Sequence, residues 1–183
     1  MTVLDLTVAA PGGPCPVSLH LPDGDGPWPA VIMYPDAAGA RPTFRAMADR
    51  LAALGFATLL PDVYYRAGDW APFDVNTVFT DPDERARMGS LGRSLTADKA
   101  IADAGAFLEF LAGRPEVAAA RVGTAGYCMG GRISLLVAGH HPDRVGAAAS
   151  FHGGRLADEA DPGSPALVAD RVRATGYVAA AED

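Results

Sequence analysis

The sequence predicts an α/β protein with a mainly parallel, twisted sheet flanked by helices. Short apolar runs, bounded by proline, glycine or polar residues, alternate along the chain with segments of helical periodicity. Continuous apolar strands of this length are typical of a parallel sheet that is covered on both faces. The order is β-β-β-α-β-α-β-α-β-(α)-β, with no internal repeat and no break in composition, so we expect a single domain over residues 1–183.

The first two strands differ from the rest. Val3 to Val8 and Val17 to Leu21 alternate apolar and polar residues, as half-buried strands do. The turn-forming residues Gly12, Gly13 and Pro14 stand between them. This arrangement predicts an antiparallel hairpin at the start of the chain.

Five further runs are continuously apolar and predict buried strands. They are Ala30 to Tyr34, Phe56 to Leu60, Val122 to Tyr127, Gly146 to Phe151 and Tyr177 to Ala181.

Helical spacing separates these strands. Apolar residues recur every three or four positions over 44–54, and Gly55 ends that predicted helix. A longer helix is predicted around 101–111 with Thr96 as its N-cap, and a third around 133–137. The stretch 65–94 has no clean period, so we expect a long excursion with a short helix near 83–87, placed to shape a binding site.

Charge and cysteine content narrow the class of protein. The formal net charge is −7 with no run of Lys or Arg, which argues against nucleic acid or an anionic membrane as partner. Residues 1–11 show no signal-peptide pattern, so we expect a cytoplasmic protein with reduced thiols at Cys15 and Cys128. The four histidines are scattered and no CxxC or HExxH motif occurs, so neither a metal nor a cofactor is expected.

The run around Cys128 predicts a nucleophile elbow. A predicted strand leads through Cys128 directly into a predicted helix, and Gly126 and Gly130 stand two residues to either side, as in the motif G-x-S-x-G. Small neighbours are needed because strand and helix approach closely at a strained residue. The helix N-terminus would favour the thiolate, and the N–H of Met129 would face a developing oxyanion. The alternative is a buried structural cysteine in a tight glycine turn.

Five segments carry a wider similarity. They are Gly126–Gly131 (GYCMGG), Tyr34–Ala37 (YPDA), Leu59–Arg66 (LLPDVYYR), Asp83–Arg87 (DERAR) and Ser150–Gly154 (SFHGG). In this order and spacing, which extend over nearly the whole chain, they resemble the dienelactone hydrolase family. The resemblance implies an α/β-hydrolase fold and hydrolysis of esters and lactones by a Cys-His-Asp triad without a cofactor.

The resemblance also implies roles for individual residues. Cys128 would attack the carbonyl and form an acyl-enzyme that water hydrolyses, with the N–H groups of Ala37 and Met129 as oxyanion donors. Asp36 stands where the family usually has a glutamate that pairs with the resting nucleophile. A loop acid that forms a turn is the alternative for Asp36.

Two further residues match positions that would contact substrate. Arg87 matches the family's arginine for the substrate carboxylate, a role that suits a planar guanidinium. His152 follows the strand beside the elbow strand and would face the cleft. A surface arginine and a capping histidine are the alternatives, and His140 and His141 are expected in solvent.

The triad is incomplete in the printed sequence. Its acid would be Asp183 or the residue after it, because the register is loose by one position. Family members run further and carry the triad histidine there, so we expect a partial chain.

The main hypothesis is therefore a hydrolase of a small ester or lactone that acts through Cys128. A non-catalytic chain that binds a partner through an exposed sheet edge at 177–181 is the second hypothesis. A general carboxylesterase or thioesterase is the third, because the fold alone does not fix the substrate. The expected partner is a small molecule, and a homo-oligomer is left open.

Overall fold

The computed structural model describes residues 1–180. Its centre is a seven-stranded sheet of order β1-β2-β4-β3-β5-β6-β7. The strands are β1 (Thr2–Ala10), β2 (Gly13–Leu21), β3 (Trp28–Tyr34), β4 (Ala57–Pro61), β5 (Val117–Tyr127), β6 (Val145–Phe151) and β7 (Thr175–Ala179). The first two pair antiparallel with each other, β2 pairs antiparallel with β4, and the remaining pairs are parallel. The predicted hairpin and mainly parallel sheet are confirmed.

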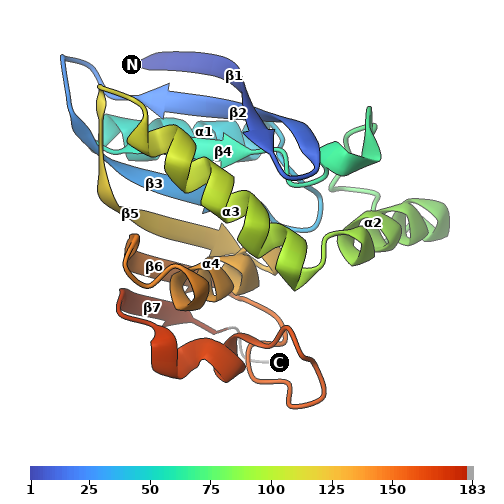
Figure 1. Cartoon of the computed structure of the whole chain (residues 1–183). Coiled ribbons are helices and arrows are strands. Elements are labelled where there is room, and N and C mark those ends of the chain that lie inside the picture. Colours follow the sequence, from blue (N-terminus) through green and yellow to red (C-terminus); the bar gives the residue numbers. More distant parts are fainter. Residues whose placement is uncertain (181–183) are drawn as a thin grey trace.

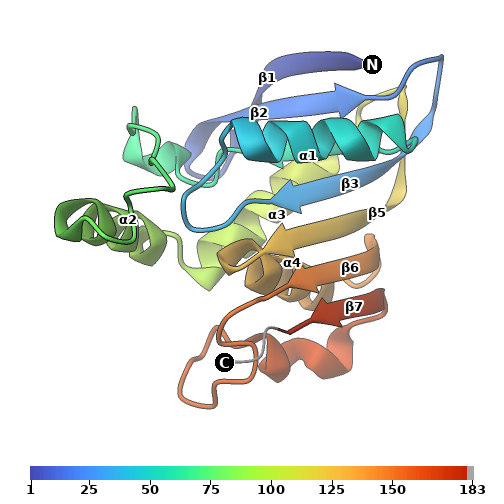
Figure 2. The same cartoon turned by 180° about the vertical axis from the view of Figure 1, so that it is seen from behind.

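Helices cover both faces of this sheet. They are α1 (Pro42–Ala53), α2 (Pro82–Ser94), α3 (Ala97–Ala112) and α4 (Met129–His140), with short 3₁₀ turns η1 (Tyr65–Ala67) and η2 (Pro165–Arg171). Helices α3 and α4 lie on the face seen in Figure 1, and α1 lies on the opposite face, seen in Figure 2. Helix α2 stands apart, beyond the carboxyl ends of β3 and β5 (Figure 1).

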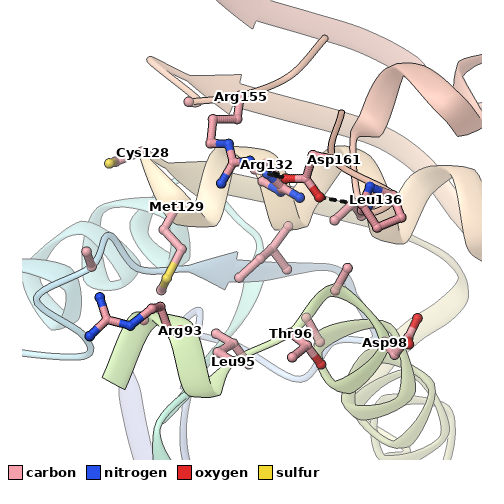
Figure 3. Close-up of a pocket in the computed structure, with 18 of the residues that line it drawn as sticks. Arg93, Leu95, Thr96, Asp98, Cys128, Met129, Arg132, Leu136, Arg155 and Asp161 are labelled. Atoms are coloured by element: carbon pink, nitrogen blue, oxygen red, sulfur yellow. Dashed lines mark hydrogen bonds and ion pairs between the residues drawn. The ribbon is translucent and has the colours of Figure 1, made fainter. Parts of the chain in front are cut away.

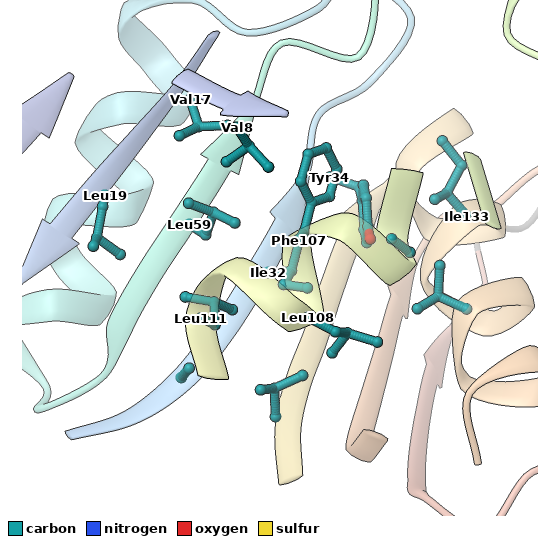
Figure 4. Close-up of a cluster of buried hydrophobic side chains, with 14 of the residues drawn as sticks. Val8, Val17, Leu19, Ile32, Tyr34, Leu59, Phe107, Leu108, Leu111 and Ile133 are labelled. Carbon is teal, nitrogen blue, oxygen red and sulfur yellow. The ribbon is translucent and has the colours of Figure 1, made fainter. Parts of the chain in front are cut away.

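The largest part of the core fills the space between the sheet and α3 and α4. Ile32 and Leu59 on the central strands are fully buried and belong to the same cluster as Leu108 and Leu111 of α3 (Figure 4). A second cluster, on the side of α1, includes Phe44. The central strands β3 and β4 therefore bury both of their faces over most of their length, which explains why they do not alternate in sequence, whereas the edge strand β7 is largely exposed.

Local signals set the helix ends as expected. The Thr96 side chain accepts a hydrogen bond from the N–H of Lys99 and caps α3. Gly55, at φ +94°, follows the end of α1 in a backbone conformation that few side chains adopt. Both positions confirm the sequence-based boundaries.

Three expectations need correction. Helix α2 is thirteen residues long, not a short turn near 83–87, because Asp81 caps it and no residue in it is buried, so no apolar period marks it in the sequence. Strand β7 lies two residues earlier than expected and ends at Ala179. His141 is only half exposed, because its ring contacts the carbonyl of Ile101 on α3 (Nε2···O 3.1 Å).

Within residues 1–180, no helix is long and apolar enough to cross a membrane.

Candidate active site

Cys128 sits at the junction of β5 and α4 with a strained backbone. Its φ is +52° and its ψ is −115°, in a region that side chains rarely adopt. The surrounding chain fixes this conformation: the N–H of Cys128 donates to the carbonyl of Phe151 (3.0 Å), and its own carbonyl accepts from the N–H of Gly131 (3.0 Å). The thiol is thereby held at the carboxyl edge of the sheet, at the N-terminus of a twelve-residue helix.

The flanking glycines are required by close backbone approach. A Cβ on Gly126 would lie 1.9 Å from the carbonyl oxygen of Gly130, and a Cβ on Gly130 would lie 2.2 Å from that of Tyr34. These distances leave no room for any side chain, so strand and helix can meet here only through glycine. The predicted elbow is present in its geometry as well as in its spacing.

A cavity of about 670 Å³ opens beside the thiol. Its walls come from α2, α3, α4 and the loop after β6 (Figure 3). Cys128, Met129 and Ala37, which the family resemblance assigns to nucleophile and oxyanion donors, line it together. Further lining residues are Gly89, Gly92, Arg93, Leu95, Thr96, Ala97, Asp98, Ala100, Arg132, Ile133, Leu136, Gly154, Arg155, Asp161, Pro162 and Gly163.

Tyr64 holds the two segments that would form an oxyanion hole. Its hydroxyl donates to the carbonyl of Ala37 (2.9 Å) and lies 3.5 Å from the sulfur of Met129. Burial raises the pKa of Tyr64, and the nearby Asp36 and Cys128 raise it further, so the phenol stays protonated and keeps its donor. This link between the two segments is visible only in the structure.

Asp36 does not contact the thiol. Its carboxylate accepts two hydrogen bonds from the guanidinium of Arg41 (2.6 and 2.8 Å) and one from the N–H of Ala38 (2.9 Å). The expected pairing with Cys128 is therefore absent among the hydrogen bonds of residues 1–180. Instead, Asp36 stabilises the turn that presents Ala37, as the alternative of a turn-forming acid anticipated.

Arg87 is also occupied elsewhere. Its guanidinium binds Glu84 in the fork geometry (3.1 and 2.7 Å), donates to the carbonyl of Ala71 (2.7 Å) and stacks 3.8 Å from the centre of the Phe73 ring. It is not among the residues that line the cavity. Arg93, six residues later on the same helix, lines it instead (Figure 3). Sequence reasoning missed Arg93 because α2 carries several arginines and no apolar period that shows which of them faces the sheet.

A cluster of three charged side chains lies on the other side of the cavity. Arg132 of α4 and Arg155 of the loop after β6 both bind the carboxylate of Asp161 (2.7 and 3.2 Å; Figure 3). The hydrogen bond from Arg132 and the N–H of Gly163 lower the pKa of Asp161 to about 2. The loop after β6 is thereby tied to α4.

Within residues 1–180, no hydrogen bond joins any of the four histidines to the sulfur of Cys128. His152 is exposed at φ +42°, with its ring centre 6.3 Å from that of Tyr127, and it does not line the cavity. The expectation that His152 faces the cleft is not met by this geometry. Asp183, the expected triad acid, lies outside the described residues. In residues 1–180 no three His, Cys, Asp or Glu side chains are grouped closely enough to hold a metal ion.

An open, mainly parallel sheet with a strained residue between its central strand and a following helix defines the α/β-hydrolase class. Residues 16–183 match the model of the dienelactone hydrolase family, and the chain belongs to this family. The carboxymethylenebutenolidase of Pseudomonas sp. (strain P51) is 32% identical over 127 residues, which are 69% of this chain and 51% of that protein.

Solved structures agree with this assignment. The structure named m3DLH has a TM-score of 0.76 and 27% identity, over 98% of this chain and 68% of that chain. The dienelactone hydrolase from Anabaena variabilis ATCC 29413 has a TM-score of 0.64 over 97% of this chain and 84% of that chain, and its 18% identity supports the fold alone. The chain spans about half the length of the curated relatives it matches.

Proposed function

We propose that the protein hydrolyses a small ester or lactone with Cys128 as the nucleophile. The observation that carries this proposal is the elbow: a strained cysteine between β5 and α4, at a helix N-terminus and on the wall of a large cavity. A structural cysteine has no need of a strained backbone at a cavity wall, whereas a nucleophile does. The interpretation of Cys128 as an inert structural cysteine is therefore the weaker one.

The chemistry follows from the residues around the sulfur. The thiolate adds to the carbonyl carbon, and the N–H groups of Met129 and Ala37 stabilise the oxyanion. Collapse of the tetrahedral species expels the alkoxide or enolate and leaves a thioester on Cys128. Water then hydrolyses the thioester, which releases the acid and restores the thiol.

The cavity walls favour a substrate that carries a carboxylate. Arg93 lines the cavity, and no ion pair or hydrogen bond engages its guanidinium within residues 1–180, in contrast to Arg87. A free guanidinium can bind two carboxylate oxygens at once. We therefore assign to Arg93 the role that the family resemblance gave to Arg87.

Turnover of an activated ester tests the nucleophile. Cys128→Ala should lower kcat/KM by at least about 10³-fold, because the step that forms the acyl-enzyme is lost. Cys15→Ala is the matched control, since Cys15 is a buried residue of β2 and does not line the cavity. Mass spectrometry of the unaltered protein should show the acyl group on Cys128. Full activity of the Cys128→Ala protein would refute the mechanism.

No histidine in residues 1–180 makes a hydrogen bond to the sulfur of Cys128, which favours a second candidate, a chain that binds a partner without catalysis. Its β7 strand lies at the sheet edge and exposes Tyr177 and Val178. Thiol alkylation at varied pH separates the two. An activated thiolate reacts at a rate that is already maximal near neutral pH, whereas an inert thiol accelerates up to alkaline pH.

A further inference from the structure

A second hydrogen-bonded chain of serine, histidine and aspartate lies on the α1 side of the sheet. Ser18 and His20 point to the same face of β2, and Asp49 comes from α1. The Oγ of Ser18 lies 2.9 Å from Nε2 of His20, and Nδ1 of His20 lies 2.6 Å from Oδ1 of Asp49. The order of these contacts, hydroxyl to Nε2 and Nδ1 to carboxylate, is that of a Ser-His-Asp catalytic triad.

The hydrogen bonds fix the tautomer of the imidazole. An ionised aspartate can only accept, so Nδ1 of His20 must donate its proton to Asp49. In the neutral form of His20 the lone pair is then on Nε2, where the hydroxyl of Ser18 can donate to it. The serine therefore faces a general base that a third group orients, which is the arrangement of an activated nucleophile.

Ser18 also has space beside it. It lines a cavity of about 340 Å³, together with Pro16 and Leu60 of the sheet and Arg41 and Arg45 at the start of α1. This cavity shares no lining residue with the one beside Cys128.

The three side chains lie at different depths, with the acid nearest to solvent and the serine reached only through the cavity that it lines. His20 is 1% exposed and Ser18 is 4% exposed, whereas the side chain of Asp49 is 38% exposed. By comparison, Ser134 is buried against Thr124 Oγ1 (2.8 Å), with no base beside it.

The charges of the cavity indicate the kind of compound that fits. Its two guanidinium groups are already neutralised, since Arg41 binds Asp36 and Arg45 binds Asp5, and the carboxylate of Asp62, which also lines it, accepts from the indole N–H of Trp70. An anion would have to compete with these carboxylates, whereas an uncharged compound would not. A volume of about 340 Å³ suits a small molecule.

We propose that Ser18 is a second nucleophile, activated by His20 and Asp49, that takes an acyl or phosphoryl group from small uncharged electrophiles. The Oγ of Ser18 bonds to the carbonyl carbon or to phosphorus, and the bond to the leaving group breaks. The hydroxyl proton passes to Nε2 of His20 and then to the leaving group. With diisopropyl fluorophosphate, the products are a phosphorylated serine and hydrogen fluoride.

Labelling with diisopropyl fluorophosphate tests this site in the Cys128→Ala protein, in which the thiol cannot react. Peptide mapping should find one adduct, on Ser18, and Ser18→Ala should abolish it. Asp49→Asn should slow labelling at least tenfold, because loss of the acid frees the imidazole to adopt the wrong tautomer. Asp143→Asn is the control, since this exposed acid pairs with Arg173 and lies outside the cavity. It should label at the unaltered rate.

Two results would overturn the proposal: no adduct on Ser18, or an Asp49→Asn protein that labels as fast as its parent. Either would mean that the three side chains only join β2 to α1. A further measurement does not depend on how the Ser18 and Asp49 variants fold. The native Cys128→Ala protein should label at Ser18 at least tenfold faster than the same protein in denaturant, and equal rates would exclude activation by the fold.

Discussion

Replacement of Gly130 by alanine tests the geometry of the elbow. The new Cβ would lie 2.2 Å from the carbonyl oxygen of Tyr34 and 2.5 Å from that of Pro35. Both neighbours are backbone atoms of the segment that leaves β3, so no side-chain rotation can relieve the contact. Since carbon and oxygen normally stay about 3.3 Å apart, the start of α4 has to move away by about 1 Å.

The expected destabilisation is moderate but measurable. Overpacking of this kind costs about 3 kcal/mol when the obstacle is rigid. Alanine regains about 1 kcal/mol because it is a better helix former than glycine. The net loss is about 2 kcal/mol, which corresponds to a melting temperature about 4 to 8 °C lower in a domain of this size.

Circular dichroism melting curves of the two proteins measure the effect. Gly176→Ala is the matched control, because a Cβ there meets no heavy atom within 4 Å and the residue also lies in regular structure, in β7. This control should melt no lower than the unaltered protein. The close-contact argument fails if Gly130→Ala melts at or above the temperature of the unaltered protein.

Three further predictions follow from single side chains. Arg93→Met should raise KM at least tenfold for an ester that carries a carboxylate and leave KM for a neutral ester unchanged. Arg87→Met should change neither KM, and steady-state kinetics of both variants with both esters test this. Burial raises the pKa of Cys15 to about 12, so iodoacetamide should label this thiol at neutral pH only after unfolding, as peptide mapping would show. Asp161, whose pKa is lowered from 3.8 to about 2 by Arg132, should stabilise the fold above pH 4 and lose that contribution as the pH falls towards 2. NMR titration of its carboxyl carbon should give a midpoint near 2, and a midpoint near 3.8 would contradict the ion pair.

The burial of Cys15 also changes how thiol labelling should be read. Preference for Cys128 over Cys15 follows from access alone, since Cys15 is fully buried and Cys128 is not. Such a preference therefore does not demonstrate an activated thiolate. Only the pH dependence of the rate at Cys128 reports the chemistry of that sulfur.

Much of the fold could be predicted because its signals are local. The proline-bounded apolar runs, the Thr96 cap and the Gly55 terminus each depend on a few neighbouring residues. The elbow is local too: three glycines around one cysteine, between a strand and a helix, determine where the backbone must be tight. Helix α2 was underestimated for the converse reason, since it buries no residue and so leaves no periodic apolar pattern.

The roles of charged side chains could not be predicted in this way. Asp36 and Arg87 stand at the positions that the family resemblance indicated, yet Arg41 and Glu84 engage them. The partners of Asp36 and Arg87 lie only five and three residues away along the chain. Each long side chain has many rotamers, however, and its surroundings in space decide which of them it adopts.

By itself, then, the sequence determined the α/β order, the family and the place of Cys128, because strand period, helix period and glycine spacing act over short distances along the chain. Only the tertiary structure decided which arginine reaches the cavity and that Tyr64 joins the segments of Ala37 and Met129. It alone brought Asp49 to His20 across 29 residues, since contacts of that kind arise when a helix packs on a sheet, and no local pattern encodes them.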